Sequence, residues 1–151
     1  MKKILILILF LINSCGYQSI YKVDQKLNDK LLKEVEFFGN EKISKQIFSN
    51  LPFKISTKDE KLDKLVLNSK ISTTETSKNS KGQVTSYRTT LIVKFSLLNE
   101  KNKLVEDRLF TEEFSYNSKE NKFKFREYQR KIEKNLISGI IEQVMIHLSL
   151  K

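Results

Sequence analysis

The period of the apolar residues changes near residue 121, and this change restricts the possible folds more strongly than any other feature of the sequence. Beyond it, apolar residues recur every three or four positions, the spacing of one helix face. This stripe comprises Phe125, Tyr128, Ile132, Leu136, Ile140, Val144 and Leu148, widened by Ile137 and Ile141. The residues expected on the opposite, solvent-exposed face are Lys131, Glu133, Lys134, Glu142 and Gln143. The pattern predicts one long amphipathic helix, in which Gly139 costs about 1 kcal/mol relative to alanine.

Three segments before residue 121 have the period of two that is typical of half-buried strands. Their apolar faces carry Leu65, Leu67, Ser69, Ile71 and Thr73 in the first segment, Tyr87, Leu91, Val93, Phe95 and Leu97 in the second, and Leu104, Phe110, Phe114 and Tyr116 in the third. Polar, turn-forming residues at 77–82 and 99–102 separate the segments. Short polar connections between successive strands predict an antiparallel meander.

A short strand and a short helix are expected before the meander. The run 35–38 is apolar and ends at Gly39, and Asn40 can cap a helix that begins directly after it. The apolar positions of that helix are Ile43, Ile47, Phe48 and Leu51, and Pro52 ends it. The element order predicts a single α+β domain over residues 34–151. We expect a two-layer sandwich, in which two helices pack on one face of a four-stranded mixed or antiparallel sheet.

The first residues of the chain are typical of a bacterial lipoprotein signal peptide. Lys2 and Lys3 precede an apolar run at 4–12, which is far shorter than the ~20 residues of a membrane-spanning helix. The run leads into Ile12-Asn13-Ser14-Cys15-Gly16, which is similar to a lipobox, and Cys15 is the only cysteine. An ordinary secretory signal is the alternative, but it would leave this thiol without a disulfide partner. We predict a signal peptide at residues 1–14, acylation of Cys15, and a lipidated tether at 15–33.

The charge balance indicates an anionic partner. The chain has 28 lysines and arginines against 18 acidic residues, for a formal net charge of +10. Such a surface suits phosphorylated lipid, acidic membrane or nucleic acid, and the predicted export excludes nucleic acid. The codon bias of an AT-rich genome would also produce many lysines, so that composition alone leaves both explanations open.

The titratable residues do not form a pattern that indicates catalysis. The single histidine, His147, falls in the last turn of the predicted helix, where partial burial or contact with the negative helix end is expected. Glu112 and Glu113 are adjacent, so that on a strand they point to opposite faces and cannot act as a pair. The sequence has no metal-ligand cluster and no glycine-rich phosphate loop. We therefore expect no enzyme, no metal and no cofactor other than the covalent lipid on Cys15.

Three stretches of the mature chain resemble the lipopolysaccharide-assembly lipoprotein LptE, in its short alphaproteobacterial form. These are Cys15-Gly16-Tyr17 with Ile20-Tyr21, then Ser86-Tyr87-Arg88-Thr89-Thr90-Leu91 with Phe95-Ser96-Leu97, and finally Phe114-Ser115-Tyr116-Asn117 followed by the long helix. The Lys122-Phe123-Lys124-Phe125 segment departs from the family, which usually has alanines at that position. The resemblance covers most of the mature chain as a pattern rather than a strict motif.

This resemblance implies a place and a partner. LptE-like proteins are anchored in the outer membrane on its periplasmic side, sit partly inside the lumen of the LptD β-barrel, help it assemble, and contact lipopolysaccharide. Basic residues of the family meet the phosphorylated lipid, and by sign and face the candidates here are Lys70, Arg88 and Lys94. The alternatives are an auxiliary lipoprotein of a lipid ABC transporter and a periplasmic lipid carrier, the latter requiring a many-stranded concave sheet.

Overall fold

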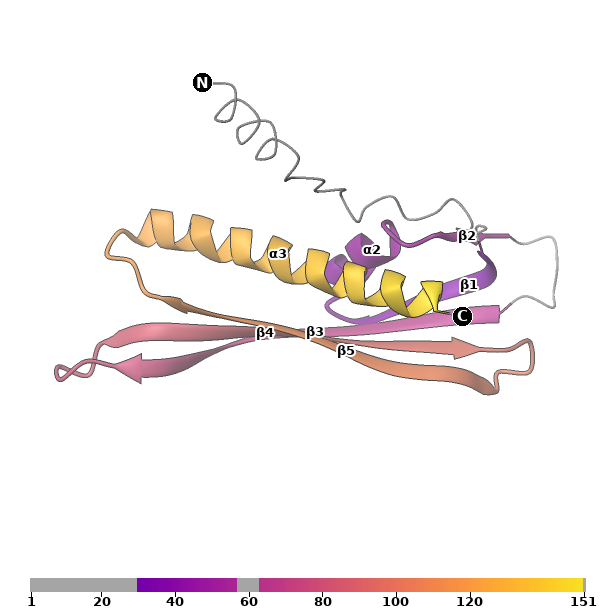
Figure 1. Cartoon of the computed structure of the whole chain (residues 1–151), viewed down its shortest axis with the longest axis horizontal. Helices are drawn as coiled ribbons and strands as arrows, with labels where there is room; N and C mark the ends of the chain where they lie inside the picture. Colours follow the sequence, from indigo (N-terminus) through magenta and orange to yellow (C-terminus); the bar gives the residue numbers. More distant parts are fainter. Residues whose placement is uncertain (1–29, 57–62, 151) are drawn as a thin grey trace, which may run out of the picture.

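The computed structural model describes residues 30–56 and 63–150, so that the predicted signal peptide, Cys15 and the tether as far as residue 29 lie outside the described residues. Figure 1 shows the elements of the described part. In chain order they are β1 (Lys30–Gly39), α2 (Glu41–Phe48), β2 (Phe53–Ile55), β3 (Asp63–Lys78), β4 (Val84–Leu98), β5 (Leu104–Asn117) and α3 (Lys122–Ser149).

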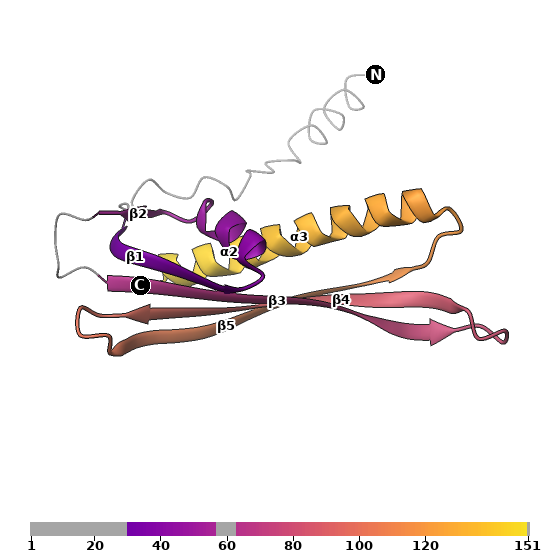
Figure 2. The same ribbon diagram turned by 180° about the vertical axis from the view of Figure 1, so that it is seen from behind.

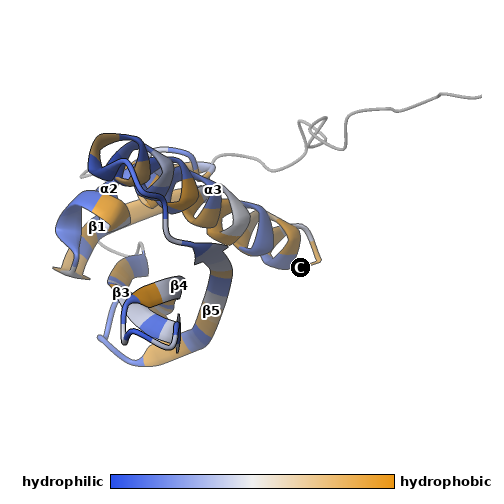
Figure 3. Cartoon of the chain, turned by 90° about the vertical axis from the view of Figure 1, so that its left-hand side faces the viewer, coloured by the Kyte–Doolittle hydropathy of each residue, from blue (hydrophilic) through white to orange (hydrophobic). Residues whose placement is uncertain are grey.

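The domain has two layers, a mixed sheet and two helices. The strand order is β2-β1-β3-β4-β5, with β1 parallel to both of its neighbours and β3, β4 and β5 antiparallel. Both helices lie on one side of the sheet, seen from opposite sides in Figures 1 and 2 and from the end of the β3–β4 hairpin in Figure 3. The predicted α+β class, the mixed sheet and the antiparallel meander are confirmed.

The sheet has five strands, and the prediction of four was wrong. The additional strand, β2, is three residues long and pairs only with β1, at the sheet edge. A segment this short shows no alternation, and only Phe53 of its residues is buried. The neighbouring strand β1 also begins at Lys30, before the boundary expected at residue 34. A register shift between Leu32 and Glu34 breaks the alternation there, which hid the buried Leu32 from a periodicity argument.

A tight corner joins β1 to α2 and ties both to β3. Gly39 has φ +71°, and a Cβ at this position would lie 2.1 Å from the backbone oxygen of Ser69. The next residue, Asn40, donates its backbone N–H to that same oxygen at 2.8 Å. Its side chain accepts a hydrogen bond from the Ile43 N–H at 3.3 Å, which confirms the predicted helix cap.

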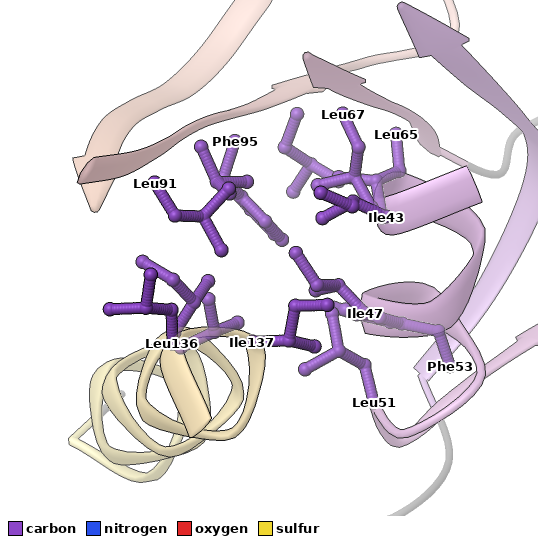
Figure 4. Packing of buried hydrophobic residues seen from close by; sticks show 14 of the residues in the cluster. Ile43, Ile47, Leu51, Phe53, Leu65, Leu67, Leu91, Phe95, Leu136 and Ile137 are labelled. Carbon is purple, nitrogen blue, oxygen red and sulfur yellow. The ribbon is translucent and has the colours of Figure 1, made fainter. Parts of the chain in front are cut away.

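The core lies between the helices and the middle of the sheet. Figure 4 shows Leu91 and Phe95 of β4 facing the labelled residues of α2 and α3. The side chains that fill this layer include Ile43, Ile47, Leu65, Leu67, Leu91, Val93, Phe95, Leu136, Ile137, Ile140 and Val144. Fully burying one such side chain stabilises the fold by about 1.5–3 kcal/mol, so that this single layer dominates the stability of the domain.

Polar groups of the edge strand β5 also hold α3, in addition to the aromatic contacts that Phe110 and Tyr116 make with the helix. Gln143 donates to Glu112 Oε1 at 2.6 Å and to the backbone oxygen of Thr111 at 3.2 Å, although the sequence placed Gln143 on the solvent face. One helical turn further, His147 pairs through Nε2 with the nearly buried carboxylate of Glu106. We call Glu106, Glu112, Gly139, Gln143 and His147 the β5–α3 seam. It places His147 in the partly buried position that was expected.

Gly139 belongs to the seam because the side chain of any other residue at this position would collide with Glu112. A Cβ at position 139 would lie 2.9 Å from Glu112 Cδ, and Gln143 holds that carboxylate in place. The close contact with the sheet therefore explains a glycine in the middle of a 28-residue helix.

We predict that Gly139→Ala leaves the free energy of unfolding nearly unchanged in the native chain, because the gain in helix propensity is offset by displacement of Glu112. In a Glu112→Ala background the obstacle is gone, and the same substitution should stabilise the fold by about 1 kcal/mol. Chemical denaturation of the four proteins of this cycle measures the difference. An equal effect of Gly139→Ala in both backgrounds would refute the role given to Glu112.

Candidate functional site

Lys70, Arg88 and Lys94 lie on the face of the sheet opposite α2 and α3, which no helix of the described residues covers. Their chain neighbours Ser69, Thr89 and Val93 are buried toward the helices, so that the three cations point the other way. Lys70 is opposite Ile92 in the ladder, while Lys94 and Arg88 lie further along β4 to either side. The three residues proposed from the sequence therefore share one face, which we call the open face.

Acidic residues of β5 compensate two of these three cations. Lys94 Nζ lies 3.1 Å from Asp107 Oδ2. Arg88 lies 3.9 Å from Glu113 Oε1 and donates from Nε to Ser115 Oγ at 3.2 Å. The side chain of Lys70 has no ion pair or hydrogen bond among the described residues, and it is exposed. Its charge is therefore the one most available to an anion from outside.

The same pattern of paired charges continues at the other side of the open face. Lys64 of β3 lies 2.5 Å from Glu36 Oε1 and 3.0 Å from Glu34 Oε1, both on β1. The hydrogen bonds to Glu36 and then to Glu34 raise the pKa of Lys64. The pairs of Arg88 and Lys94 are solvent-exposed, and pairs of that kind contribute about 0–1 kcal/mol each, so that they set the pattern of charge on this face more than the stability. The result is a polar face with alternating signs rather than one basic patch.

A groove opens on the helix side of the sheet, between the first half of α3 and the part of β3 beyond α2. Its volume is about 660 Å³. The lining residues are Ile71, Ser72, Thr73, Thr89, Tyr116, Phe123, Arg126, Gln129, Arg130 and Glu133. Arg126 and Arg130 are four residues apart, which places them on one side of the helix. Neither has an ion pair among the described residues, whereas Glu133 supplies the carboxylate of the lining.

An aromatic cluster supports the helix at this groove. The Tyr116 ring lies 6.0 Å from Phe125 and 5.9 Å from Tyr128, measured between centroids. The Tyr116 hydroxyl is 3.0 Å from Thr89 Oγ1 and accepts from Gln129 Nε2 at 3.1 Å. The groove wall is therefore fixed by packing on both sides. The sequence argument missed Arg126 and Arg130, although their helical spacing was a signal that could have singled them out.

Two further features of the described residues concern metal sites and membrane-spanning helices. Within residues 30–56 and 63–150, no three or more His, Cys, Asp or Glu side chains are grouped to hold a metal ion. In the same ranges, no helix combines the length and the apolar character that crossing a membrane requires. Glu112 faces the β5–α3 seam, while Glu113 faces Arg88 on the opposite side, as the sequence predicted. What the geometry provides is an open face with paired charges and a groove with two arginines.

We predict that the pKa of Asp107 lies below its ordinary value of 3.8, because Ser96 donates to its carboxylate and Lys94 lies beside it. A carboxyl whose pKa is lower in the folded chain stabilises the fold above 3.8, and that contribution is lost as the pH falls through the lowered value. NMR titration should show that Ser96→Ala raises the pKa of Asp107 more than Lys94→Gln does. A pKa at or above 3.8, or a larger effect of Lys94→Gln, would contradict this assignment.

Comparison of the fold identifies solved structures with the same architecture. Rare lipoprotein B from Shewanella oneidensis is similar with a TM-score of 0.57 at 14% identity, over 78% of this chain and 96% of that chain. A minor lipoprotein from Acinetobacter baumannii gives 0.57 at 19% identity, over 80% and 91%. Lipoprotein B from Nitrosomonas europaea gives 0.54 at 13% identity, over 77% and 83%. No protein-family model and no curated protein sequence matches the chain. At these identities the likeness shows a shared fold.

Proposed function

We propose that this chain is an outer-membrane lipoprotein that assembles with an LptD-type β-barrel, partly fills its lumen, and takes part in lipopolysaccharide transport to the outer leaflet. The observation that carries the proposal is Cys15, in a sequence that resembles a lipobox, placed ahead of a domain whose fold is shared with solved proteins that are named lipoproteins. The resemblance of three stretches to LptE supplies the specific partner.

The open face suits a partner with a polar interior. The lumen of an outer-membrane barrel is lined with polar side chains and water. On the open face the charges alternate in sign and are held in pairs, such as Lys94 with Asp107. Its exposed apolar residues include Val105 and Leu109, which flank Asp107 on β5, and Phe38 on β1, which the strands β3 and β4 separate from them. Such a surface can contact a polar wall at many points without requiring an apolar counterpart.

Lys70 is the residue we propose for direct contact with lipopolysaccharide phosphate. Lys94 and Arg88 already have acidic partners on β5, whereas Lys70 has none among the described residues. A lysine binds phosphate as a point charge, which needs no fixed geometry.

The two alternatives receive less support. A lipid carrier needs an apolar interior for acyl chains, and here the side chains of α2 and α3 fill the apolar side of the sheet (Figure 4). An auxiliary transporter subunit should present a continuous apolar face to a soluble partner, and polar residues interrupt the apolar ones on the open face. We also propose that the protein acts by binding rather than by catalysis.

Purification from outer membranes tests the assembly. The full chain, with its signal and a C-terminal tag, is expressed in a bacterium with two membranes and isolated in mild detergent. We predict that an LptD-type barrel is recovered in equal amount, and that Cys15→Ala removes the protein from the outer-membrane fraction. Recovery of a soluble transporter component, or of the chain without any partner, would overturn the proposal.

Binding of purified lipopolysaccharide tests the role of Lys70. We predict that Lys70→Gln weakens binding by about two- to fivefold, the effect of one exposed charge, while Lys94→Gln has little effect because Asp107 already compensates that lysine. Both variants lose one positive charge, so that the pair controls for net charge. Equal losses in both variants would indicate a general charge effect and would contradict a specific role of Lys70.

A further inference from the structure

The strand β3 is longer than the strand beside it, which leaves part of one edge open. The pairing of β1 with β3 ends where Gly39 meets Ser69, and the Asn40 N–H takes the Ser69 oxygen as the chain turns into α2. Beyond Ser69, β3 continues to Lys78 and pairs on its other side with β4. No described strand pairs with the remaining edge. Its backbone N–H and C=O groups form a template for one more strand.

Two hollows adjoin this open edge. The first, of about 700 Å³, is lined by Gly39, Asn40, Glu41 and residues 68–71. The second is the groove beneath α3, which begins at Ile71 and includes Ser72 and Thr73. Because Ile71 lines both, the hollows follow one another along the same stretch of β3. A strand that continued the line of β1 would lie about 4.8 Å from β3, and both hollows lie along that line.

The stretch of the β3 edge from Lys70 to Glu75 has the composition best suited to pairing with another strand. The four residues between these two are uncharged, and three of them are β-branched (Ile71, Thr73 and Thr74). Register shifts between Glu75 and Lys78 distort the strand near its tip, which limits regular pairing there. The other long edge, on β5, carries charged side chains at five positions, which is how sheet edges are protected against pairing.

The charges beside the open edge indicate what kind of strand would bind. Arg126 and Arg130 form the wall of the groove without ion pairs among the described residues. Glu133 is the acidic residue of that wall, and Glu41 in the other hollow is already paired with Lys45 at 2.9 Å. We propose that the edge of β3 from Lys70 to Glu75 is a docking site for an extended acidic segment of a partner protein, which adds a strand to the sheet and places carboxylates near Arg126 and Arg130.

Amide hydrogen exchange of the full chain in mild detergent tests the site with a synthetic probe. The peptide Thr-Glu-Val-Glu-Val-Glu-Thr presents its carboxylates on one face when extended, and Thr-Glu-Pro-Glu-Pro-Glu-Thr has the same charge but cannot form a regular strand. The first peptide should slow exchange within residues 70–75, and the second should not. Arg126→Gln with Arg130→Gln should weaken binding up to about tenfold. The matched control, Lys131→Gln with Lys134→Gln on the solvent side of α3, should leave binding unchanged.

Three results would overturn the inference. Equal binding of the proline peptide would mean that charge alone is recognised, without strand addition. Protection of β5 in place of residues 70–75 would assign the wrong edge. Dihexanoyl phosphatidic acid slowing exchange at 70–75 as strongly as the extended peptide would indicate an anionic lipid as the occupant. Unchanged exchange in β4 confirms that the variants are folded, and none of these outcomes depends on the barrel assignment.

Discussion

The structure depends on apolar burial on one side of a single sheet. Alternate residues of β3 and β4 point toward α2 and α3, and the buried stripe of α3 closes this layer from Ile132 to Val144. Among the described residues these two helices cover one face of the sheet, and the opposite face and part of the β3 edge have no described element against them. The open face keeps its charges in pairs, and β3 continues as an open edge beyond the corner at Gly39.

The β5–α3 seam shows how polar contacts add to the aromatic ones of Tyr116 in positioning the long helix over an edge strand. Glu112 and Glu106 point toward the helix. Gly139 leaves room for Glu112, Gln143 donates a hydrogen bond to it, and His147 pairs with Glu106, so that the three helix residues follow one another at intervals of four. Partly buried polar groups with partners specify one arrangement, since any sliding of the helix would leave a carboxylate without its hydrogen bond.

The periodicity of the apolar residues predicted the order of strands and helices along the chain and the antiparallel meander. The type of residue at position 40 predicted the helix cap. Each of these features depends on residues that are close together in the sequence. Periodicity failed where the backbone departs from regularity, at the bulge before Val35 and in the three-residue strand β2. Gln143 was wrongly assigned to the solvent-exposed face of the helix. It faces β5 because Glu112 of that strand accepts a hydrogen bond from its side chain. The shared face of Lys70, Arg88 and Lys94 followed from strand parity, whereas their compensation by Asp107 and Glu113 depends on the register with β5, which periodicity does not specify.

The central claim is that this domain works inside a larger outer-membrane assembly. Electron cryo-microscopy of the complex that the tagged, lipidated chain forms in outer membranes tests it most directly. The account predicts density for the two-layer domain within a barrel lumen, with the open face toward the barrel wall. Density for the domain outside a barrel, or bound to a soluble transporter component, would contradict the account.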